Sequence, residues 1–161
     1  MATEKLQYVI SLDVFEKDAK LPAEDLKLLK EAEKTSSDAY APYSQFKVGA
    51  AILLDNGKII CGNNQENAAY PSGLCAERVA LFYAISQNKS AVIKTIAVSC
   101  QSNSKDPVTP CGACRQAIAE YEQKQGKKIR IVMGVPGRKI YVAQGIESLL
   151  PFMFGGKELK K

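Results

Sequence analysis

The sequence predicts a layered α/β domain in which helices flank a mixed β-sheet. Three observations lead to this prediction. Apolar residues recur at helical spacing in several stretches, short β-branched runs lie between those stretches, and an Asp-Asn-Gly triplet separates two apolar runs. Alternating helical and extended segments are typical of layered α/β domains. The chain has 161 residues, enough for one hydrophobic core, so we expect a single domain over residues 1–161.

The first half of the chain predicts a helix followed by a β-hairpin. Pro22 opens a run with acidic residues in its first turn and leucines at helical spacing, which is typical of the start of an amphipathic helix. Residues 46–62 contain two apolar runs around Asn56 and Gly57, a dipeptide that favours tight hairpin turns. Residues 1–20 match no clear pattern and are left unassigned.

The second half predicts further helices and strands. A helical stretch runs from about Cys75 to Gln87, with Val79, Phe82, Tyr83 and Ser86 on one face. The remaining expected elements are a buried strand over 95–100, a helix over about 111–124, strands over 127–135 and 138–144 joined by a Pro136-Gly137 turn, and a short helix over 146–154.

The composition argues against several classes of protein. Hydrophobic residues at 46% and charged residues at 24% are ordinary globular values, and no apolar run approaches the roughly 18 residues of a membrane span. The N-terminus lacks the pattern of a signal peptide, so we expect a cytoplasmic location and no membrane partner. The net charge of +5 is scattered, apart from a small "KELKK" cluster, whereas nucleic-acid binding favours a basic stripe. We therefore expect no nucleic-acid partner.

The chain has five cysteines and no histidine. An odd number of cysteines without a secretion signal indicates reduced thiols with metal or packing roles. Cys111 and Cys114 stand three residues apart behind Pro110, a residue that suits the first turn of a helix. Their sulfurs can reach the roughly 3.8 Å separation implied by tetrahedral zinc with bonds near 2.3 Å. On its own, this spacing fits zinc and a redox or packing pair equally well.

Cys75 and Glu77 form the second half of a candidate metal site, at the start of another expected helix. Residues i and i+2 point about 200° apart on a regular helix, so both can face one metal only if Cys75 precedes the helix. Two helix N-termini would then converge and favour thiolates. Three thiolates leave one position for water, the pattern of a catalytic zinc. Alternatively, Cys100 or Cys61 closes the site; we favour packing roles for both.

Four sequence blocks resemble a known family: "YAPYSQFKVGAAI", "NNQENAAYPSGLCAER", "PCGACRQ" and "LLPFMFG". Together they resemble the small homotetrameric, zinc-dependent cytidine deaminases of the cytidine and deoxycytidylate deaminase superfamily. The resemblance covers about residues 40–155. It implies a three-layer α/β/α domain with a mixed central sheet, one Zn²⁺ per subunit and a homotetramer with shared active sites. The implied reaction, in pyrimidine salvage, converts free cytidine and 2′-deoxycytidine to uridine and 2′-deoxyuridine plus ammonia.

The resemblance also assigns catalytic and metal-binding roles. It implies that Cys75, Cys111 and Cys114 hold zinc and that Glu77 is the proton shuttle. Zinc lowers the pKa of bound water, and Glu77 would take the water's proton, deliver it to N3 of cytosine and assist the departure of ammonia. Arg78, next to the cluster, could donate hydrogen bonds to thiolate sulfurs. A surface salt bridge is the alternative for Arg78.

Substrate contacts are implied for several further residues. An extended backbone would project Asn64 and Glu66 to the same side, where the resemblance assigns them to the ribose; turn formation is the alternative. Phe46 becomes an aromatic wall against the base, although a core position fits equally. Tyr70 and a C-terminal ring, either Phe154 or Phe152, would enter a neighbouring subunit's pocket, and the family pattern favours Phe154. The implied substrate-binding set is Phe46, Asn64, Glu66, Tyr70, Ala76 and Phe154.

Three other functions remain open from the sequence alone. A nucleic-acid editing deaminase shares the zinc chemistry but needs a cationic channel with stacking aromatics. A deaminase of cytosine-nucleoside antibiotics fits the same residues. A noncatalytic zinc module would use Cys100 as a fourth ligand and Glu77 would then have no role.

Overall fold

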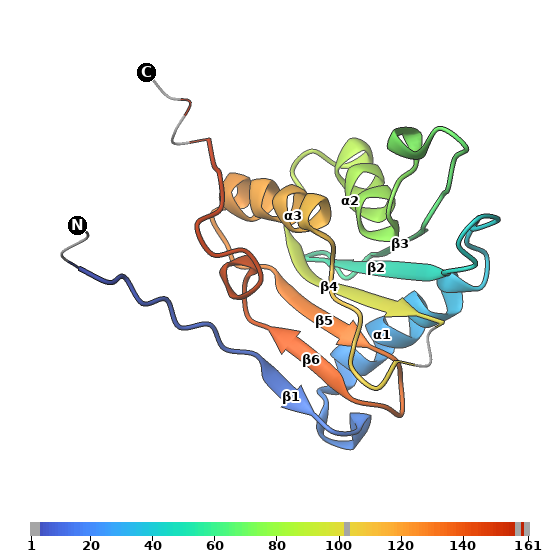
Figure 1. Ribbon diagram of the computed structural model, residues 1–161, viewed down its shortest axis with the longest axis horizontal. Helices are drawn as coiled ribbons and strands as arrows, with labels where there is room; N and C mark the ends of the chain where they lie inside the picture. Colours follow the sequence, from blue (N-terminus) through green and yellow to red (C-terminus); the bar gives the residue numbers. More distant parts are fainter. Residues whose placement is uncertain (1–3, 102–103, 157–158, 160–161) are drawn as a thin grey trace.

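The computed structural model describes residues 4–101, 104–156 and 159. Within them, six strands form one sheet, which is covered by α1 on one face and by α2 and α3 on the other (Figure 1). In chain order the elements are β1 (Asp13–Phe15), η1 (Asp18–Lys20), α1 (Ala23–Ser36), β2 (Val48–Leu54), β3 (Ile59–Asn63), η2 (Tyr70–Ser72), α2 (Ala76–Gln87), β4 (Ile93–Cys100), α3 (Gly112–Gln125), β5 (Arg130–Gly134), β6 (Ile140–Ala143) and η3 (Ile146–Ser148). The predicted three-layer α/β/α fold is confirmed.

The sheet is mixed, as expected, with the strand order β1-β6-β5-β4-β2-β3. β4 and β5 are parallel, whereas the other neighbouring pairs are antiparallel. Two parallel neighbours need a crossover connection, and α3 lies in the chain between them. The chain leaves the carboxyl end of β4 and then enters α3, so the N-terminus of α3, with Cys111 and Cys114, follows that end of the strand.

The central strands are buried on both faces, which explains their nearly continuous apolar sequences. In β2, Ala50, Ile52 and Leu54 pack in the core under α2 and α3. The alternate residues Ala51 and Leu53 pack in the second core, under α1. This two-residue period divides one apolar run between two cores.

Gly62 lets α2 approach the sheet closely. A Cβ atom built at Gly62 would lie 2.6 Å from the backbone nitrogen of Ala80, so no side chain fits between β3 and α2. The glycine on β3 thus sets the height of α2 above the sheet, and with it the position of the first turn of this helix.

Several predicted elements are confirmed. The helix after Pro22 forms, and the hairpin β2–β3 forms with Gly57 at a φ of 81°. The turn at Pro136-Gly137 is closed by a hydrogen bond from the Arg138 N–H to the Val135 carbonyl. In the described segments, no helix combines the length and hydropathy needed to cross a bilayer.

Other predictions need correction. The expected helix over 146–154 is only the three-residue η3, since Phe152, just after Pro151, has a φ of 57° that no α-helix accommodates. The unassigned N-terminal segment contributes β1, which pairs with β6 at the edge of the sheet.

The helices confirm one prediction and correct another. The face of α2 that carries Phe82 and Tyr83 forms as predicted, and it points outward because Ala80, Leu81 and their neighbours occupy the buried side. Pro110 lies one residue before the N-cap of α3 and so precedes the first turn. The "KELKK" cluster, apart from residue 159, lies outside the described residues.

Candidate functional site

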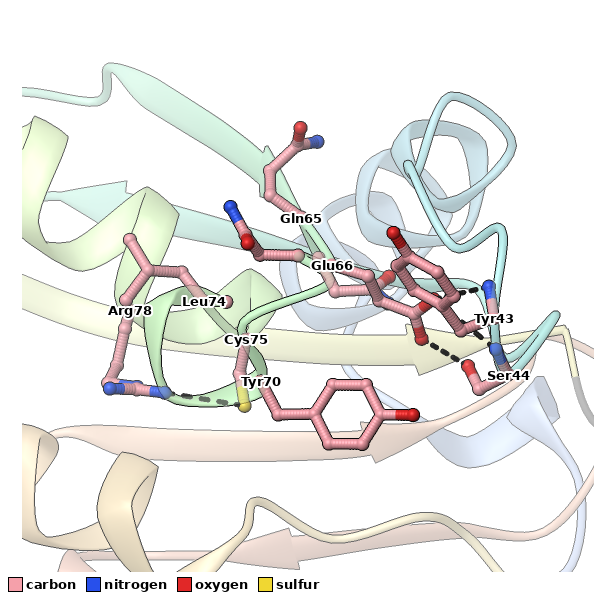
Figure 2. Close-up of a pocket in the computed structure, with 11 residues that line it drawn as sticks. Tyr43, Ser44, Gln65, Glu66, Tyr70, Leu74, Cys75 and Arg78 are labelled. Atoms are coloured by element: carbon pink, nitrogen blue, oxygen red, sulfur yellow. Dashed lines mark hydrogen bonds between the residues drawn. The ribbon is translucent and has the colours of Figure 1, made fainter.

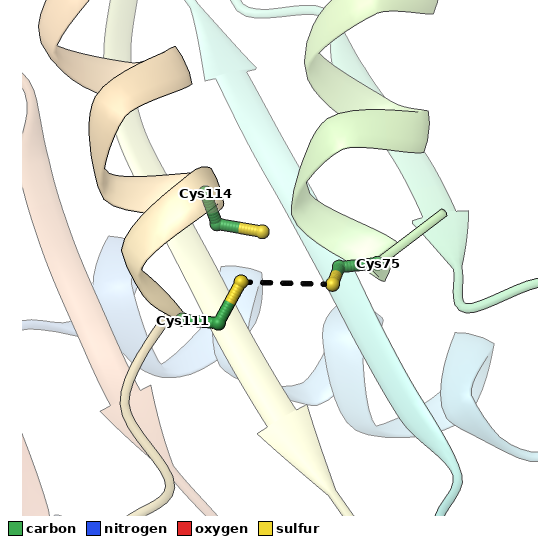
Figure 3. A group of neighbouring side chains, drawn as sticks. All are labelled: Cys75, Cys111 and Cys114. Carbon is green, nitrogen blue, oxygen red and sulfur yellow. Dashed lines mark hydrogen bonds between the residues drawn. The ribbon is translucent and has the colours of Figure 1, made fainter. Parts of the chain in front are cut away.

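Cys75, Cys111 and Cys114 come together at the N-termini of α2 and α3 (Figure 3). Cys75 and Cys111 are the N-cap residues, with extended backbone at ψ values of 152° and 166°. The Sγ atoms of all three residues lie within 4.8 Å of one another, and those of Cys75 and Cys111 are 3.8 Å apart. This separation agrees with the value expected for two sulfurs on tetrahedral zinc. The prediction that Cys75 precedes its helix is correct.

The donor set fits zinc. Three thiolates are soft ligands of a kind that suits zinc, and they supply three of its four tetrahedral positions. Among the described residues, the group of His, Cys, Asp or Glu side chains close enough to hold a metal consists of these three cysteines. Cys100 is buried but does not belong to the group. Cys61 is exposed on β3, so its predicted packing role is wrong.

The sulfurs of Cys75 and Cys114 affect each other's protonation. A hydrogen bond from the Cys114 thiol, helped by the guanidinium of Arg78, lowers the pKa of Cys75 to about 5. The same hydrogen bond, together with burial and the nearby charge of Glu77, raises the pKa of Cys114. Without a metal, the first negative charge therefore collects on Cys75. A divalent cation binds cysteine as the thiolate, so its binding also requires Cys114 to lose its proton.

Arg78 lies against the cluster, as the sequence predicted. Its Nη2 atom donates to the Sγ of Cys75 at 3.8 Å, and this hydrogen bond raises the pKa of the guanidinium (Figure 2). Its Nε atom is buried and has no hydrogen-bond partner in the described part of the chain. The side chain is half-buried next to Cys75, and it forms no ion pair with a carboxylate of the described residues.

Glu77 lies in the first turn of α2 and is only 5% exposed. Burial raises the pKa of its carboxyl group, and negative charge on Cys75 raises it further. A buried carboxyl beside a metal site is suited to hold and release a proton. Ala76, the residue between Cys75 and Glu77, is fully buried.

A pocket of about 480 Å³ opens next to Cys75 (Figure 2). Five of the residues predicted for the site line it: Asn64, Glu66, Tyr70, Cys75 and Arg78. The other six do not line it. Ala76, Glu77, Cys111 and Cys114 lie at the starts of α2 and α3, Phe46 stands before β2 and is 40% exposed, and Phe154 is 58% exposed on the C-terminal segment. A pocket with several convergent polar groups is typical of a small-molecule site.

Tyr43 and Ser44 are site residues that the sequence analysis missed. The Oε2 atom of Glu66 accepts from the backbone N–H of Tyr43 at 2.9 Å and of Ser44 at 3.3 Å, and its Oε1 atom accepts from the Ser44 hydroxyl (Figure 2). The hydrogen bond from the Ser44 hydroxyl, followed by the one from Tyr43, lowers the pKa of Glu66. This carboxylate is therefore held in its ionised form.

The amide of Asn64 binds the backbone that leads into β2. Its Oδ1 atom accepts from the Val48 N–H at 2.8 Å, and its Nδ2 atom donates to the Phe46 carbonyl at 3.0 Å. Asn64 therefore fixes the position of Phe46 in addition to lining the pocket. One amide hydrogen remains available to a ligand.

Arg115 and Gln116 were also missed, although both belong to the "PCGACRQ" block. Arg115 donates to the carbonyls of Pro110 and Leu149, each at 2.7 Å. Gln116 donates to the carbonyl of Phe154 at 2.9 Å. These contacts tie the loop that carries Cys111 to the C-terminal segment. The cysteine spacing identified the metal site, but it gave no signal for this tether.

A sulfur-ligated zinc position beside a buried carboxyl group, on an α/β/α fold, defines a catalytic metal centre of the deaminase class. Comparisons with known proteins agree. Residues 22–129 match the model of the cytidine and deoxycytidylate deaminase zinc-binding region. The chain therefore belongs to the cytidine and deoxycytidylate deaminase family.

Individual relatives carry the same family name. The chain is 50% identical to a cytidine deaminase of Halalkalibacterium halodurans over 93 residues, which cover 58% of this chain and 68% of the relative. It is 33% identical to a cytidine deaminase of Mycobacterium tuberculosis over 142 residues, 88% of this chain and 98% of the relative. The crystal structure of a Burkholderia pseudomallei cytidine deaminase superposes with a TM-score of 0.69 at 37% identity, covering 80% of this chain and 97% of that one.

Proposed function

We infer that this chain catalyses the zinc-dependent hydrolytic deamination of free cytidine and 2′-deoxycytidine to uridine and 2′-deoxyuridine, with release of ammonia, in pyrimidine salvage. The single observation that carries this function is the group of three cysteine sulfurs at two helix N-termini, next to the buried Glu77. The alignment with named cytidine deaminases over nearly their whole length supports the choice of substrate.

Glu77 carries the proton transfers in this proposal. When bound to Cys75, Cys111 and Cys114, zinc supplies Lewis-acid activation of water. The Glu77 carboxylate would accept a proton from the attacking water as its oxygen adds to C4 of cytosine, and would deliver that proton to N3. It would then transfer the second proton of the water to the amino group as the C4–N bond breaks and ammonia leaves. Its place two residues after Cys75, in the first turn of α2, supports this role.

The sugar and the base are bound by residues around the pocket. Glu66 accepts hydrogen bonds from ribose hydroxyls, a role supported by its ionised state and its place in the pocket wall. Asn64 offers its remaining amide hydrogen to the sugar. Phe46 packs against the base, and Ala76 contributes backbone next to Cys75. Arg78 holds the Cys75 thiolate and withdraws charge from it.

We further propose a homotetramer in which neighbouring subunits share active sites. Tyr70 is 77% exposed and Phe154 is 58% exposed, so both rings are available to a neighbouring subunit. Phe152 packs against Tyr8 of its own chain, with ring centroids 5.3 Å apart, which favours Phe154 as the inserted ring. Light scattering on the purified protein tests this proposal, because it gives the mass of the assembly directly.

Location and domain organisation remain proposals. Zinc ligation by three thiolates requires reduced cysteines, which supports a cytoplasmic location. One continuous sheet from β1 to β6 supports a single domain over residues 1–161. The absence of a nucleic-acid partner stays a prediction from the scattered charge.

The choice among substrates can be tested with one set of assays. Conversion of a cytosine nucleoside to a uracil nucleoside lowers its ultraviolet absorbance. We expect this fall in absorbance with cytidine and with 2′-deoxycytidine. A single-stranded DNA rich in cytosine should give no product. Turnover of the polymer alone would favour a nucleic-acid editing function, and the absence of turnover with every cytosine compound would favour a noncatalytic zinc module.

A further inference from the structure

The hydroxyl group of Ser44 links two parts of the proposed substrate site. It donates a hydrogen bond to Oε1 of Glu66, and it accepts one from the backbone N–H of Phe46 at 3.0 Å. A serine hydroxyl has one donor and two acceptor positions. The Ser44 hydroxyl therefore donates to Glu66, which is proposed to bind the ribose. It also accepts from the backbone of Phe46, which is proposed to pack against the base.

Glu66 is held by hydrogen bonds from one short segment of the chain. All three donors to its carboxylate, two backbone N–H groups and one hydroxyl, belong to Tyr43 and Ser44. Among the described residues no lysine or arginine forms a salt bridge with this carboxylate. A carboxylate has about four acceptor positions, so three donors fix its orientation and leave one position for a sugar hydroxyl.

The turn that carries Phe46 is strained. Gln45, the residue between Ser44 and Phe46, has a φ of 58°, a left-handed conformation that costs a residue with a side chain roughly 1 kcal/mol. The conformation is held by two hydrogen bonds, from the Gln45 N–H to the Ala41 carbonyl at 3.1 Å and from the Phe46 N–H to the Ser44 hydroxyl. Loss of the Ser44 hydroxyl removes one of the two.

We propose that Ser44 is a positioning residue that makes the enzyme select nucleosides with a 3′-hydroxyl, the ring hydroxyl common to cytidine and 2′-deoxycytidine, because the Ser44 hydroxyl fixes Glu66 relative to Phe46. The inference rests on the proposed deamination of cytidine. Ser44 acts through Glu66: without the serine hydroxyl, the carboxylate adopts several orientations and binds the sugar hydroxyl less well. A nucleoside without the 3′-hydroxyl loses nothing through Glu66.

The test compares cytidine with 2′,3′-dideoxycytidine in steady-state kinetics of wild type and Ser44→Ala. We expect kcat/KM for cytidine to fall about tenfold, the loss expected for one hydrogen bond to a charged group, mainly through a higher KM. For the dideoxynucleoside we expect a much smaller fall, caused by looser packing of Phe46. The ratio of the two kcat/KM values should therefore shrink severalfold. Ser44→Thr retains the hydroxyl and should restore most of the ratio.

A double-mutant cycle isolates the contact. In a Glu66→Ala background, Ser44→Ala should leave the ratio unchanged, because the carboxylate that Ser44 positions is gone. Ser86→Ala is the matched control, since Ser86 is also exposed and its hydroxyl also makes a local hydrogen bond, to the Tyr83 carbonyl. Thermal unfolding and zinc content of each variant show whether the fold is retained.

The outcomes are distinct. Normal wild-type turnover of cytidine with an unchanged ratio in Ser44→Ala would overturn the role of Ser44 and leave the proposed function standing. An equal loss on both nucleosides, carried by kcat, would also overturn it, since that pattern reports general damage to the site. If the wild type turned over neither nucleoside, the proposed function itself would be wrong.

Discussion

The Sγ atoms of Cys75 and Cys111 lie 3.8 Å apart, although 36 positions separate the two residues in the chain. Both are N-cap residues of helices that cover the same face of the sheet (Figure 3). The packing of α2 and α3 therefore brings the ligands together, and each helix dipole adds positive potential where the thiolates collect. The position of the metal is set by the core of the fold.

Loss of one ligand should remove the metal. We expect about one zinc ion per chain in wild type and far less than one in Cys111→Ala, because two sulfurs and water bind zinc much more weakly than three sulfurs. Cys61→Ala is the control, since Cys61 is exposed and lies outside the group. Metal analysis after gel filtration measures both. Full zinc content in Cys111→Ala would refute the assigned ligand set.

The guanidinium of Arg78 should slow the release of zinc. The hydrogen bond and charge of Arg78 lower the pKa of Cys75, so without the guanidinium a proton competes more strongly with zinc for this sulfur and the sulfur is less well oriented. We therefore expect Arg78→Ala to lose roughly ten- to a hundredfold in zinc affinity or in turnover. Competition with a chromogenic chelator measures the affinity. Arg78→Lys keeps the charge but changes the donor geometry, so its zinc affinity should lie between those of wild type and Arg78→Ala. Unchanged affinity and turnover in Arg78→Ala would remove this residue from the mechanism.

A methyl group at Gly62 should disturb α2. Because the new Cβ would lie 2.6 Å from the Ala80 nitrogen, we expect Gly62→Ala to lower the free energy of unfolding by about 1–3 kcal/mol. The shifted helix should also bind zinc less tightly, since Cys75 is its N-cap. Urea denaturation checks the first effect. Gly156→Ala is the control, as a Cβ there meets no atom within 4 Å; equal stability of the two variants would contradict the packing argument.

The Gln116 side chain should hold the C-terminal segment in place. Gln116→Ala loses the hydrogen bond to the Phe154 carbonyl, so we expect faster amide hydrogen exchange over residues 152–155 and a severalfold higher KM for cytidine, with zinc content unchanged. Gln87→Ala, a substitution at the exposed end of α2, serves as the control. Unaltered exchange in Gln116→Ala would show that the segment is held by other contacts.

Much of the fold followed from local patterns. Apolar runs located β2, β4 and β5, and Pro22 located the start of α1. β1 was missed because a three-residue strand depends on its partner: Val14 is placed by pairing with Tyr141, far along the chain. The prediction of a helix over 146–154 was wrong because it relied on the spacing of apolar residues and ignored Pro151, which interrupts a helix at that position.

The metal site could be predicted from the sequence for a geometric reason. The contacts that support it could not be predicted. Cys75 and Glu77 can share a metal only from a helix entry, so their spacing alone predicted the extended N-cap that is observed. Hydrogen bonds such as those from Ser44 to Glu66 and from Arg115 to Leu149 join positions 22 and 34 residues apart. Only the folded chain brings such partners together, and no local pattern in the sequence marks them.

The most direct test of the central claim is the turnover of cytidine by wild type and by Glu77→Gln, with zinc measured in the same samples. Glutamine preserves the shape of the side chain but cannot accept and deliver the proton. We expect both proteins to hold about one zinc ion per chain and turnover to fall by roughly 10²–10⁴-fold in the variant. Wild-type rates in Glu77→Gln, or full activity in protein freed of zinc, would contradict the account.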